Sequence, residues 1–363
     1  MRAVGMSSSD RTPVSLPGTA ESPTADVIGA LLLAGCAAWT LYTAAGRDTH
    51  PEGVLLGLLA VAAGYAGGRV AGAVVPVGAP TAVALVVGVL ALVVPGGLSG
   101  DPAAPPLHDM DADGALLALA VGAACCAVHA ARAADLRIRL LLAALACGIS
   151  VEALATGSVA GVLACGAALV VAGSVTFVRR RLPVLLLLAL CAGMAAGTPL
   201  LLARADGSAG AFSSATPLAD QRAALWHDAV SEAAGAPLRG VGPGRFAELS
   251  PAAQESATPG GASSAALQAA AEQGVPGVCL LAASFGWMLW TLRRSPGPTT
   301  VALTAAGALT ALAAEAAVSP VLSYPGVTAG AGLLVGMATA RPLALALAPD
   351  QSEPPAPTPS ADR

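Results

Sequence analysis

The chain has 363 residues, of which 55% are hydrophobic and only 11% are charged, and its formal net charge is −4. Soluble globular domains are about one quarter charged, so this composition excludes a soluble globular protein and indicates an integral membrane protein. Aromatic residues make up only 3% of the chain, and the abundant alanines and glycines allow membrane helices to pack closely. The sequence therefore predicts an all-α fold, a polytopic bundle of transmembrane helices.

The two ends of the chain differ from everything between them. Residues 1–24 are polar and lack the apolar core of a signal peptide, and residues 349–363 are proline-rich. We expect both to be disordered tails. Between them lie ten apolar segments, each near the roughly 20 residues that a helix needs to cross a bilayer. These segments are 26–45, 53–75, 78–98, 114–131, 139–157, 159–178, 182–203, 275–292, 299–317 and 326–346.

The arginines predict which side of the membrane each loop occupies. Ten spans place both termini on one side, whereas the short loops of the other side hold only Arg47 and Arg204, and segment 100–114 is acidic. Basic residues in short loops mark the cytoplasmic side, so we expect a multi-pass protein of the cytoplasmic (inner) membrane with both termini cytoplasmic. The arginines on the side of the termini are Arg69, Arg132, Arg137, Arg139, Arg179, Arg180, Arg181, Arg293 and Arg294.

This topology divides the chain into two membrane regions and one large loop. Residues 25–204 would hold transmembrane helices 1–7 and residues 275–348 helices 8–10, with residues 205–274 between them as an extracytoplasmic helical loop. Long loops are exempt from the charge rule, so the arginines in this loop do not contradict the orientation.

The cysteines and histidines give no sign of a metal site or a disulfide. All seven cysteines lie inside apolar segments, where they serve as small apolar packing residues. The four histidines form no pair at helical spacing, so neither a haem nor a zinc site is expected. We expect no cofactor and no nucleic-acid partner, and the sequence leaves the oligomeric state open.

The large loop begins with a predicted helix over residues 216–235. Thr216 suits its N-cap and Gly235 its left-handed stop. At 100° per residue, Arg222 falls in the middle of the apolar face, whereas His227 lies on the opposite face. An arginine on a buried face must snorkel to water or meet an anion. Its partner would be a nearby acid, a lipid headgroup or a substrate phosphate.

The stretch "LRGVGPGRF", residues 238–246, follows this helix. Its three glycines permit positive φ and close approach of the backbone. The stretch is no dinucleotide fingerprint, because Arg245 stands where the third glycine would be. One interpretation is a tight turn that returns the chain to the membrane. The other is a nest of backbone amides at Gly242 and Gly244 that binds an anion with help from Arg239 and Arg245; the glycines alone favour the turn.

The order of these motifs resembles the O-antigen ligase and polymerase family of membrane glycosyltransferases. Arg222 is followed four residues later by Trp226, then by "PLRGVGPGRF" (237–246) and "LQAAAEQGVPG" (267–277). The segment from 319 to 336 also resembles the last outer turn of the family and the span after it. The resemblance implies a metal-independent transfer of glycans from an undecaprenyl diphosphate carrier to an acceptor outside the cytoplasmic membrane. It also implies that Arg222 holds the diphosphate, with a lipid-linked glycan donor and membrane lipids as partners.

One departure from the family pattern affects the expected catalysis. The histidine and asparagine that open the last loop helix in the family fall on Ser263 and Ser264, either of which could cap that helix before Gly274 ends it. A serine hydroxyl is a poor general base without an activating partner. The base could be another residue, the protein could bind lipid-linked glycan without turnover, or the acceptor could need no base. The candidates for another base are His227, Glu248 and Glu255.

Two acids lie inside predicted spans, Glu152 and Glu315. Acids in membranes are functional suspects, and pairing with a loop arginine is favoured here over proton transfer. His129 lies at the other end of its span, and we interpret it as structural. Three functions remain: a glycan ligase or polymerase, a non-catalytic glycan-binding or envelope-assembly scaffold, and a transporter. The transporter ranks last, because the two halves of the chain show no repeat.

Overall fold

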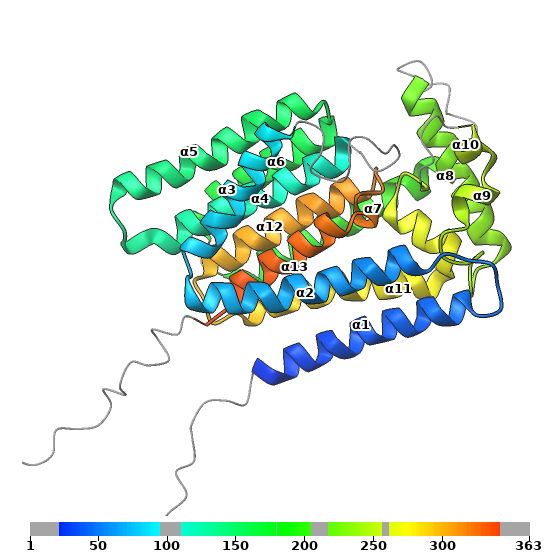
Figure 1. Ribbon diagram of the computed structural model, residues 1–363, viewed down its shortest axis with the longest axis horizontal. Helices are drawn as coiled ribbons and strands as arrows, with labels where there is room; N and C mark the ends of the chain where they lie inside the picture. The colour runs from blue at the N-terminus through cyan, green and yellow to red at the C-terminus, as the bar shows by residue number, and fades with distance from the viewer. Residues whose placement is uncertain (1–21, 95–109, 179, 205–216, 256–260, 342–363) are drawn as a thin grey trace, which may run out of the picture.

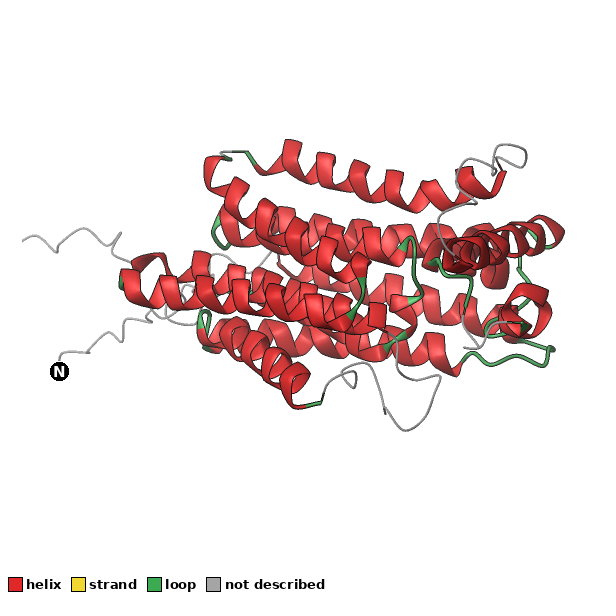
Figure 2. Cartoon of the chain, turned by 90° about the horizontal axis from the view of Figure 1, so that it is seen from above, coloured by secondary structure: helices red, strands yellow, loops and turns green. Residues whose placement is uncertain are grey.

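The computed structural model describes residues 22–94, 110–178, 180–204, 217–255 and 261–341, and the regular elements among them are all helices (Figures 1 and 2). The predicted all-α class is therefore confirmed. Of the two predicted tails, residues 1–21 and 349–363 lie outside the described residues.

Helices occupy all ten segments in which the sequence predicted spans. Eight of them are long and apolar enough to cross a membrane, and α3 and α13 are shorter apolar helices. Short 3₁₀ turns follow α4, α5 and α6, and another precedes α13. The ten helices are α1 (Ser22–Ala44), α2 (Glu52–Val74), α3 (Gly78–Val93), α4 (Met110–Ala130), α5 (Leu136–Glu152), α6 (Val159–Ser174), α7 (Arg181–Arg204), α11 (Ala265–Arg294), α12 (Thr299–Ala316) and α13 (Pro325–Thr339).

Two helices end earlier than the apolar pattern predicted. α3 was expected to reach residue 98 but ends at Val93, and α13 was expected to reach residue 346 but ends at Thr339. In the sequence, prolines stand shortly after both ends, at positions 95 and 342. Proline disfavours a helical conformation in the residue before it, so hydropathy alone overestimated both lengths.

The separation of the fifth and sixth spans is confirmed near Gly157. This glycine adopts a left-handed conformation with φ of 78°. Ser158 then caps α6, because its Oγ accepts the amide of Gly161 at 3.0 Å. A left-handed glycine followed by a serine N-cap ends one helix and begins the next.

The centre of the bundle is formed by α4 and α12, most of whose residues are buried. Small side chains allow this close packing, most clearly between α2 and α13. A Cβ at Gly68 would collide with the backbone oxygen of Leu333, and a Cβ at Gly332 with that of Val61. Small residues at helix contacts are the usual basis of close association in membranes.

A second, smaller layer lies at one end of the bundle and is called the cap below. It consists of residues 217–255 and 261–274, with α8 (Pro217–Gly235), α9 (Phe246–Leu249), α10 (Pro251–Gln254) and the first part of α11 (Figure 1). The predicted loop helix is confirmed as α8. Gly274 interrupts α11 with φ of 70°, as expected from its predicted role as a helix stop. The cap has its own core of Leu225, Ala229, Phe246, Ala253, Ala262, Leu267 and Ala271.

Candidate functional site: the cap and the cavity beneath it

The glycine-rich turn of the cap folds around Glu272. The amide of Gly242 donates to the backbone oxygen of Glu272 at 2.9 Å. The carboxylate of Glu272, only 4% exposed, accepts backbone hydrogen bonds from Gly244 and Phe246. The amides of the turn are thus engaged within the chain. An anion at the predicted nest would therefore contact the side chains of the arginines rather than the amides of Gly242 and Gly244.

The three glycines use the positive φ that glycine permits. Gly240, Gly242 and Gly244 have φ of 63°, 110° and 76°. A Cβ at Gly240 would collide with the backbone of Glu272. Close approach between the turn and α11 therefore requires glycine at this position.

Two arginines join the turn to the end of α1 and to the connection that follows it. Arg47 donates from Nη1 to the backbone oxygen of Gly240 at 2.8 Å. Arg239 donates from Nη2 to the backbone oxygen of Tyr42 at 2.9 Å, and its guanidinium carbon lies 4.4 Å from the centroid of the Tyr42 ring. Arg239, predicted as a substrate ligand, thus also holds the cap on the bundle.

Arg222 joins the cap to the opposite side of the bundle. Its Nη2 lies 3.1 Å from Oδ2 of Asp111 in the first turn of α4. Asp111 also accepts a 2.6 Å hydrogen bond from Ser158, the N-cap of α6. The side chain of Arg222 remains 43% exposed, against 15% for Asp111. An acid is therefore the partner of this arginine in the structure, and the exposed part of the guanidinium keeps N–H donors for a ligand.

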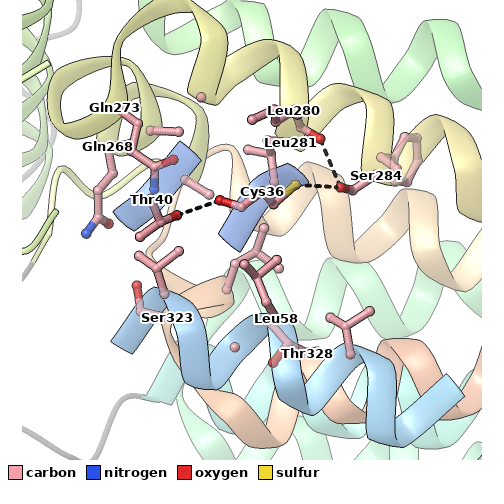
Figure 3. A pocket seen from close by; sticks show the side chains of 18 of the residues that line it. Cys36, Thr40, Leu58, Gln268, Gln273, Leu280, Leu281, Ser284, Ser323 and Thr328 are labelled. Atoms are coloured by element: carbon pink, nitrogen blue, oxygen red, sulfur yellow. Dashed lines mark hydrogen bonds between the residues drawn. The ribbon is translucent and has the colours of Figure 1, made fainter. Parts of the chain in front are cut away.

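A cavity of about 410 Å³ lies beneath the turn, between α1, α2, α11, α12 and the start of α13 (Figure 3). Within the bundle its walls are mostly apolar, and the hydroxyls of Thr40, Ser284 and Thr328 donate to backbone oxygens close by in the chain. Near the cap the lining turns polar. The polar residues there are His50, Gln268, Glu272 and Gln273.

His50 and Glu248 meet where the cavity reaches the cap. The amide of His50 donates to the backbone oxygen of Pro243 at 2.9 Å, and both His50 and Gly244 line the cavity. Nε2 of His50 lies 3.9 Å from Oε1 of Glu248, whose other oxygen lies 3.8 Å from Nε of Arg245. The side chains of His50 and Glu248 are 66% and 56% exposed, so both are open to solvent.

The other two candidate bases lie elsewhere. His227 is exposed on α8, away from the core of the cap, as its predicted face requires. Glu255 is exposed at the end of α10. Neither lines the cavity, and neither does Arg222. Of the three candidates, Glu248 is therefore the one that the fold brings to the cavity, through its contact with His50.

Ser263 and Ser264 occupy the positions at which the family has its histidine and asparagine. Ser263 adopts φ of 48°, and its carbonyl accepts the indole N–H of Trp226 at 3.3 Å. Ser264 occupies the N-cap position of α11, but its side chain makes no capping bond, contrary to expectation. Its Oγ is fully buried and has no hydrogen-bond partner among the described residues. The hydroxyl of Ser264 is therefore out of reach of a substrate.

The acids and the histidine inside the spans have different environments. Glu315 is 3% exposed and lies close to Gly114 of α4. Oε1 of Glu152 is buried without a hydrogen-bond partner in the described part of the chain, so its predicted pairing with a cap arginine does not occur there. His129 is buried, with Nε2 3.0 Å from the backbone oxygen of Ala172.

Sequence reasoning missed His50, Asp111 and the role of Glu272. The predicted topology contained the signal for the first, because the loop around residues 46–51 and the large loop were expected on the same side of the membrane. Pairing a polar residue of that short loop with the large loop would have singled out His50. Asp111 lies in the acidic segment 100–114 and Glu272 in the stretch 267–277. Nothing in either stretch predicted which residues these two acids contact.

A bundle of apolar helices under a polar cap, with a cavity between them, is the architecture of a polytopic membrane protein. Residues 143–282 match the family model described as O-Antigen ligase. The match runs from α5 through the cap into α11, and it supports the O-antigen ligase/polymerase-like family that the motifs predicted. A search of curated proteins and a search of solved structures each found no match.

Proposed function

We propose that this O-antigen ligase-like membrane protein acts on glycans linked to undecaprenyl diphosphate at the outer face of the cytoplasmic membrane. The cavity beneath the cap carries this proposal. Its walls are apolar within the bundle and polar at the glycine turn, which suits a ligand with an apolar chain and a polar head. Its volume of about 410 Å³ lies within the usual range of ligand sites.

In this proposal the polyprenyl chain enters between α1, α2 and α11, and the head group emerges beside Gly244 and Arg245. Arg222 lies outside the lining of the cavity, so in this proposal the diphosphate extends beyond the cavity to reach it, and Asp111 fixes one of its N–H groups. The charge of arginine is permanent, and its planar donors match phosphate oxygens. Such donors stabilise the negative charge that develops on a leaving diphosphate.

The transfer step would break the bond between the anomeric carbon of the sugar and the diphosphate oxygen. A hydroxyl of the acceptor forms the new bond to that carbon, the diphosphate leaves with the electron pair, and the hydroxyl loses its proton. We assign the proton to the imidazole of His50, whose Nε2 lies 3.9 Å from Oε1 of Glu248. Histidine is the side chain most often used to accept a proton near neutral pH, which suits it to this task.

The second candidate is binding without transfer, in a non-catalytic glycan-binding or scaffold protein. The burial of Ser264 favours it, because the position that carries the family's asparagine cannot contact a ligand. The two candidates predict the same binding of a lipid-linked glycan and differ in whether undecaprenyl diphosphate is released.

The test uses the full chain in lipid nanodiscs with a fluorescent undecaprenyl-diphosphate oligosaccharide and an envelope extract as the source of acceptor. We expect binding and release of undecaprenyl diphosphate from the wild type. Arg222→Ala should lower the release rate by roughly 10²–10³-fold, the usual loss for one donor to a developing charge. Release that survives this substitution would remove the role of Arg222. Binding without release would establish the second candidate.

A matched pair of variants tests the cavity. Leu281→Trp fills its wall, whereas Cys279→Trp places the same ring on an exposed position of the same helix. We expect only the first to weaken binding of the lipid-linked glycan, by roughly tenfold or more. Equal affinity of both variants for the lipid would show that the chain does not occupy this cavity.

A further inference from the structure

A second pocket lies at the end of the bundle opposite the cap. Its volume is about 340 Å³, and its lining comes from the beginning of α1 and the last turns of α2, α11 and α13. Figure 1 shows these helix ends on the side of the bundle away from the cap. Three arginines line it, one from each of three segments: Arg69 of α2, Arg294 of α11 and Arg341, which follows α13. The positive-inside expectation assigns this end to the cytoplasmic side.

One of the three arginines is neutralised within the pocket wall. Nη2 of Arg69 lies 3.4 Å from Oδ2 of Asp26, and its Nη1 donates to the backbone oxygen of Thr339. The hydroxyl of Tyr65 donates to the other oxygen of Asp26 at 2.7 Å. Arg69 and Asp26 thus form a fixed, overall neutral pair on one side of the pocket.

The other two arginines bring charge without an acid to balance it. The guanidinium carbon of Arg294 lies 4.5 Å from the centroid of the Trp290 ring, and among the described residues it has no ion pair. Arg341 is exposed and likewise has no acidic partner in the described part of the chain. Three arginines against one aspartate leave an excess of two positive charges in the pocket.

The remaining polar groups of the wall are already engaged. Ser295 donates to the backbone oxygen of Ala338 at 2.8 Å, and Thr291 donates to that of Met288 at 2.7 Å. The donors left for a ligand are therefore the guanidinium N–H groups of Arg294 and Arg341. Paired, planar donors with permanent charge favour phosphate oxygens over other acceptors.

We propose that this pocket binds a phosphate group, held by Arg294 and Arg341 against the fixed Arg69–Asp26 pair. The group is either inorganic phosphate or the phosphate of an anionic lipid headgroup, which basic pockets between membrane helices commonly bind. The site is separate from the cavity beneath the cap, and the inference does not depend on the proposed transferase activity.

The experiment uses the full chain, purified in a neutral detergent, with two probes. Sodium phosphate is titrated calorimetrically against sodium chloride at equal ionic strength, and retention of phosphatidylglycerol against phosphatidylcholine is measured by native mass spectrometry. Saturable phosphate binding assigns a small anion, and selective retention of phosphatidylglycerol assigns a lipid headgroup. Either result supports the site, and the absence of both in the wild type would overturn it.

Single substitutions supply a matched control. Arg293→Gln and Arg294→Gln remove the same charge from adjacent positions at the end of α11, but only Arg294 lines the pocket. We expect Arg294→Gln to weaken binding about fivefold and the double variant with Arg341→Gln roughly 30-fold, with Arg293→Gln within about twofold of the wild type. Equal weakening by Arg293→Gln and Arg294→Gln would show general attraction to a positive surface and overturn the proposal.

Discussion

The two ends of the molecule differ in which of their arginines face a cavity. In the cap, Arg47 and Arg239 donate to backbone oxygens, and Arg222 pairs with Asp111. At the far end, Arg294 and Arg341 line a pocket without an acidic partner among the described residues. Arg69 and Arg181 at the far end are held as well, by Asp26 and by the backbone oxygens of Ser295 and Gly297. The difference therefore lies in Arg294 and Arg341, which line a pocket and donate to no acid in the described part of the chain.

This contrast shows that the number of arginines in a region does not measure the charge that it offers to a ligand. An arginine that is paired with a carboxylate orients a ligand and donates hydrogen bonds to it, but the pair exerts little net electrostatic attraction on that ligand. Recognition at the cap would then depend on the shape of the cavity and on the N–H groups that Arg222 and Arg245 keep. Recognition at the far end would depend on charge. Substitutions at each end should separate these two modes.

The largest effect is expected at Glu272, which organises the cap. Glu272→Ala removes the acceptor of two backbone amides, that of the buried Phe246 and that of the exposed Gly244. A buried amide without an acceptor costs about 1–3 kcal/mol, and a lost hydrogen bond at an exposed amide about 0.5–1.5 kcal/mol, so we expect a loss of roughly 2–4 kcal/mol in the free energy of unfolding of the cap. Limited proteolysis within residues 236–255, followed by mass spectrometry, would detect the opened turn.

The exposed Glu248 provides the control for that measurement. Glu248→Ala removes a carboxylate from the same turn but leaves no buried amide unpaired among the described residues, so its proteolysis should resemble that of the wild type. Phosphate binding at the far end should be unchanged in both variants. A Glu272→Ala protein with a protected turn would mean that these backbone bonds contribute little to the cap.

A smaller effect, confined to the far end, is expected at Gly68. Gly68→Val would force α2 away from the backbone of α13 near Leu333. Overpacking of this kind costs about 1–3 kcal/mol, so the thermal midpoint in detergent should fall. It would also displace Arg69 from Thr339 and weaken phosphate binding, while the proteolysis of the cap stays unchanged.

Gly67 is the matched control for this substitution. It is adjacent in α2, but it is exposed, and no described atom of a neighbouring residue lies within 4 Å of the place that a Cβ would take. Gly67→Val should therefore leave both the midpoint and phosphate binding close to those of the wild type. If Gly67→Val and Gly68→Val had the same effect, helix propensity rather than close packing would explain the loss.

The sequence predicted the features of the fold that local chemistry determines. Ten apolar segments became helices, α8 lies where Pro217 and Gly235 indicated, and Gly274 interrupts α11. Each of these depends on residues within a few turns of one another. The helix ends of α3 and α13 were wrong because apolar residues continue past the proline that limits each helix.

The site could be predicted only in part, because its contacts join distant segments. Glycine spacing indicated the left-handed turn, and helical periodicity placed Arg222 on the apolar face of α8. The partners of these residues come from elsewhere: Asp111 lies 111 residues before Arg222, and His50 reaches Pro243 from the α1–α2 connection. Such pairs follow from how the helices of the bundle pack, which no periodicity within one segment encodes.

The smallest effect on stability is expected from Asp111→Asn, although it alters the arginine at the centre of the proposed function. Arg222 is 43% exposed, and water screens such pairs, so the substitution should cost at most about 1 kcal/mol of unfolding free energy. The amide oxygen of the new side chain would still accept the hydrogen bond from Ser158, which keeps the start of α6 in place. Release of undecaprenyl diphosphate should fall by a few fold, because the guanidinium loses the carboxylate that orients it.

A double-mutant cycle with Arg222→Gln would isolate that orienting contribution. If Asp111 acts on release only through Arg222, then Asp111→Asn should have no further effect once the arginine is absent. An additive loss would instead give Asp111 a contact of its own with the lipid-linked glycan. Asp111 would then belong to the ligand site together with Arg222, its partner in the structure.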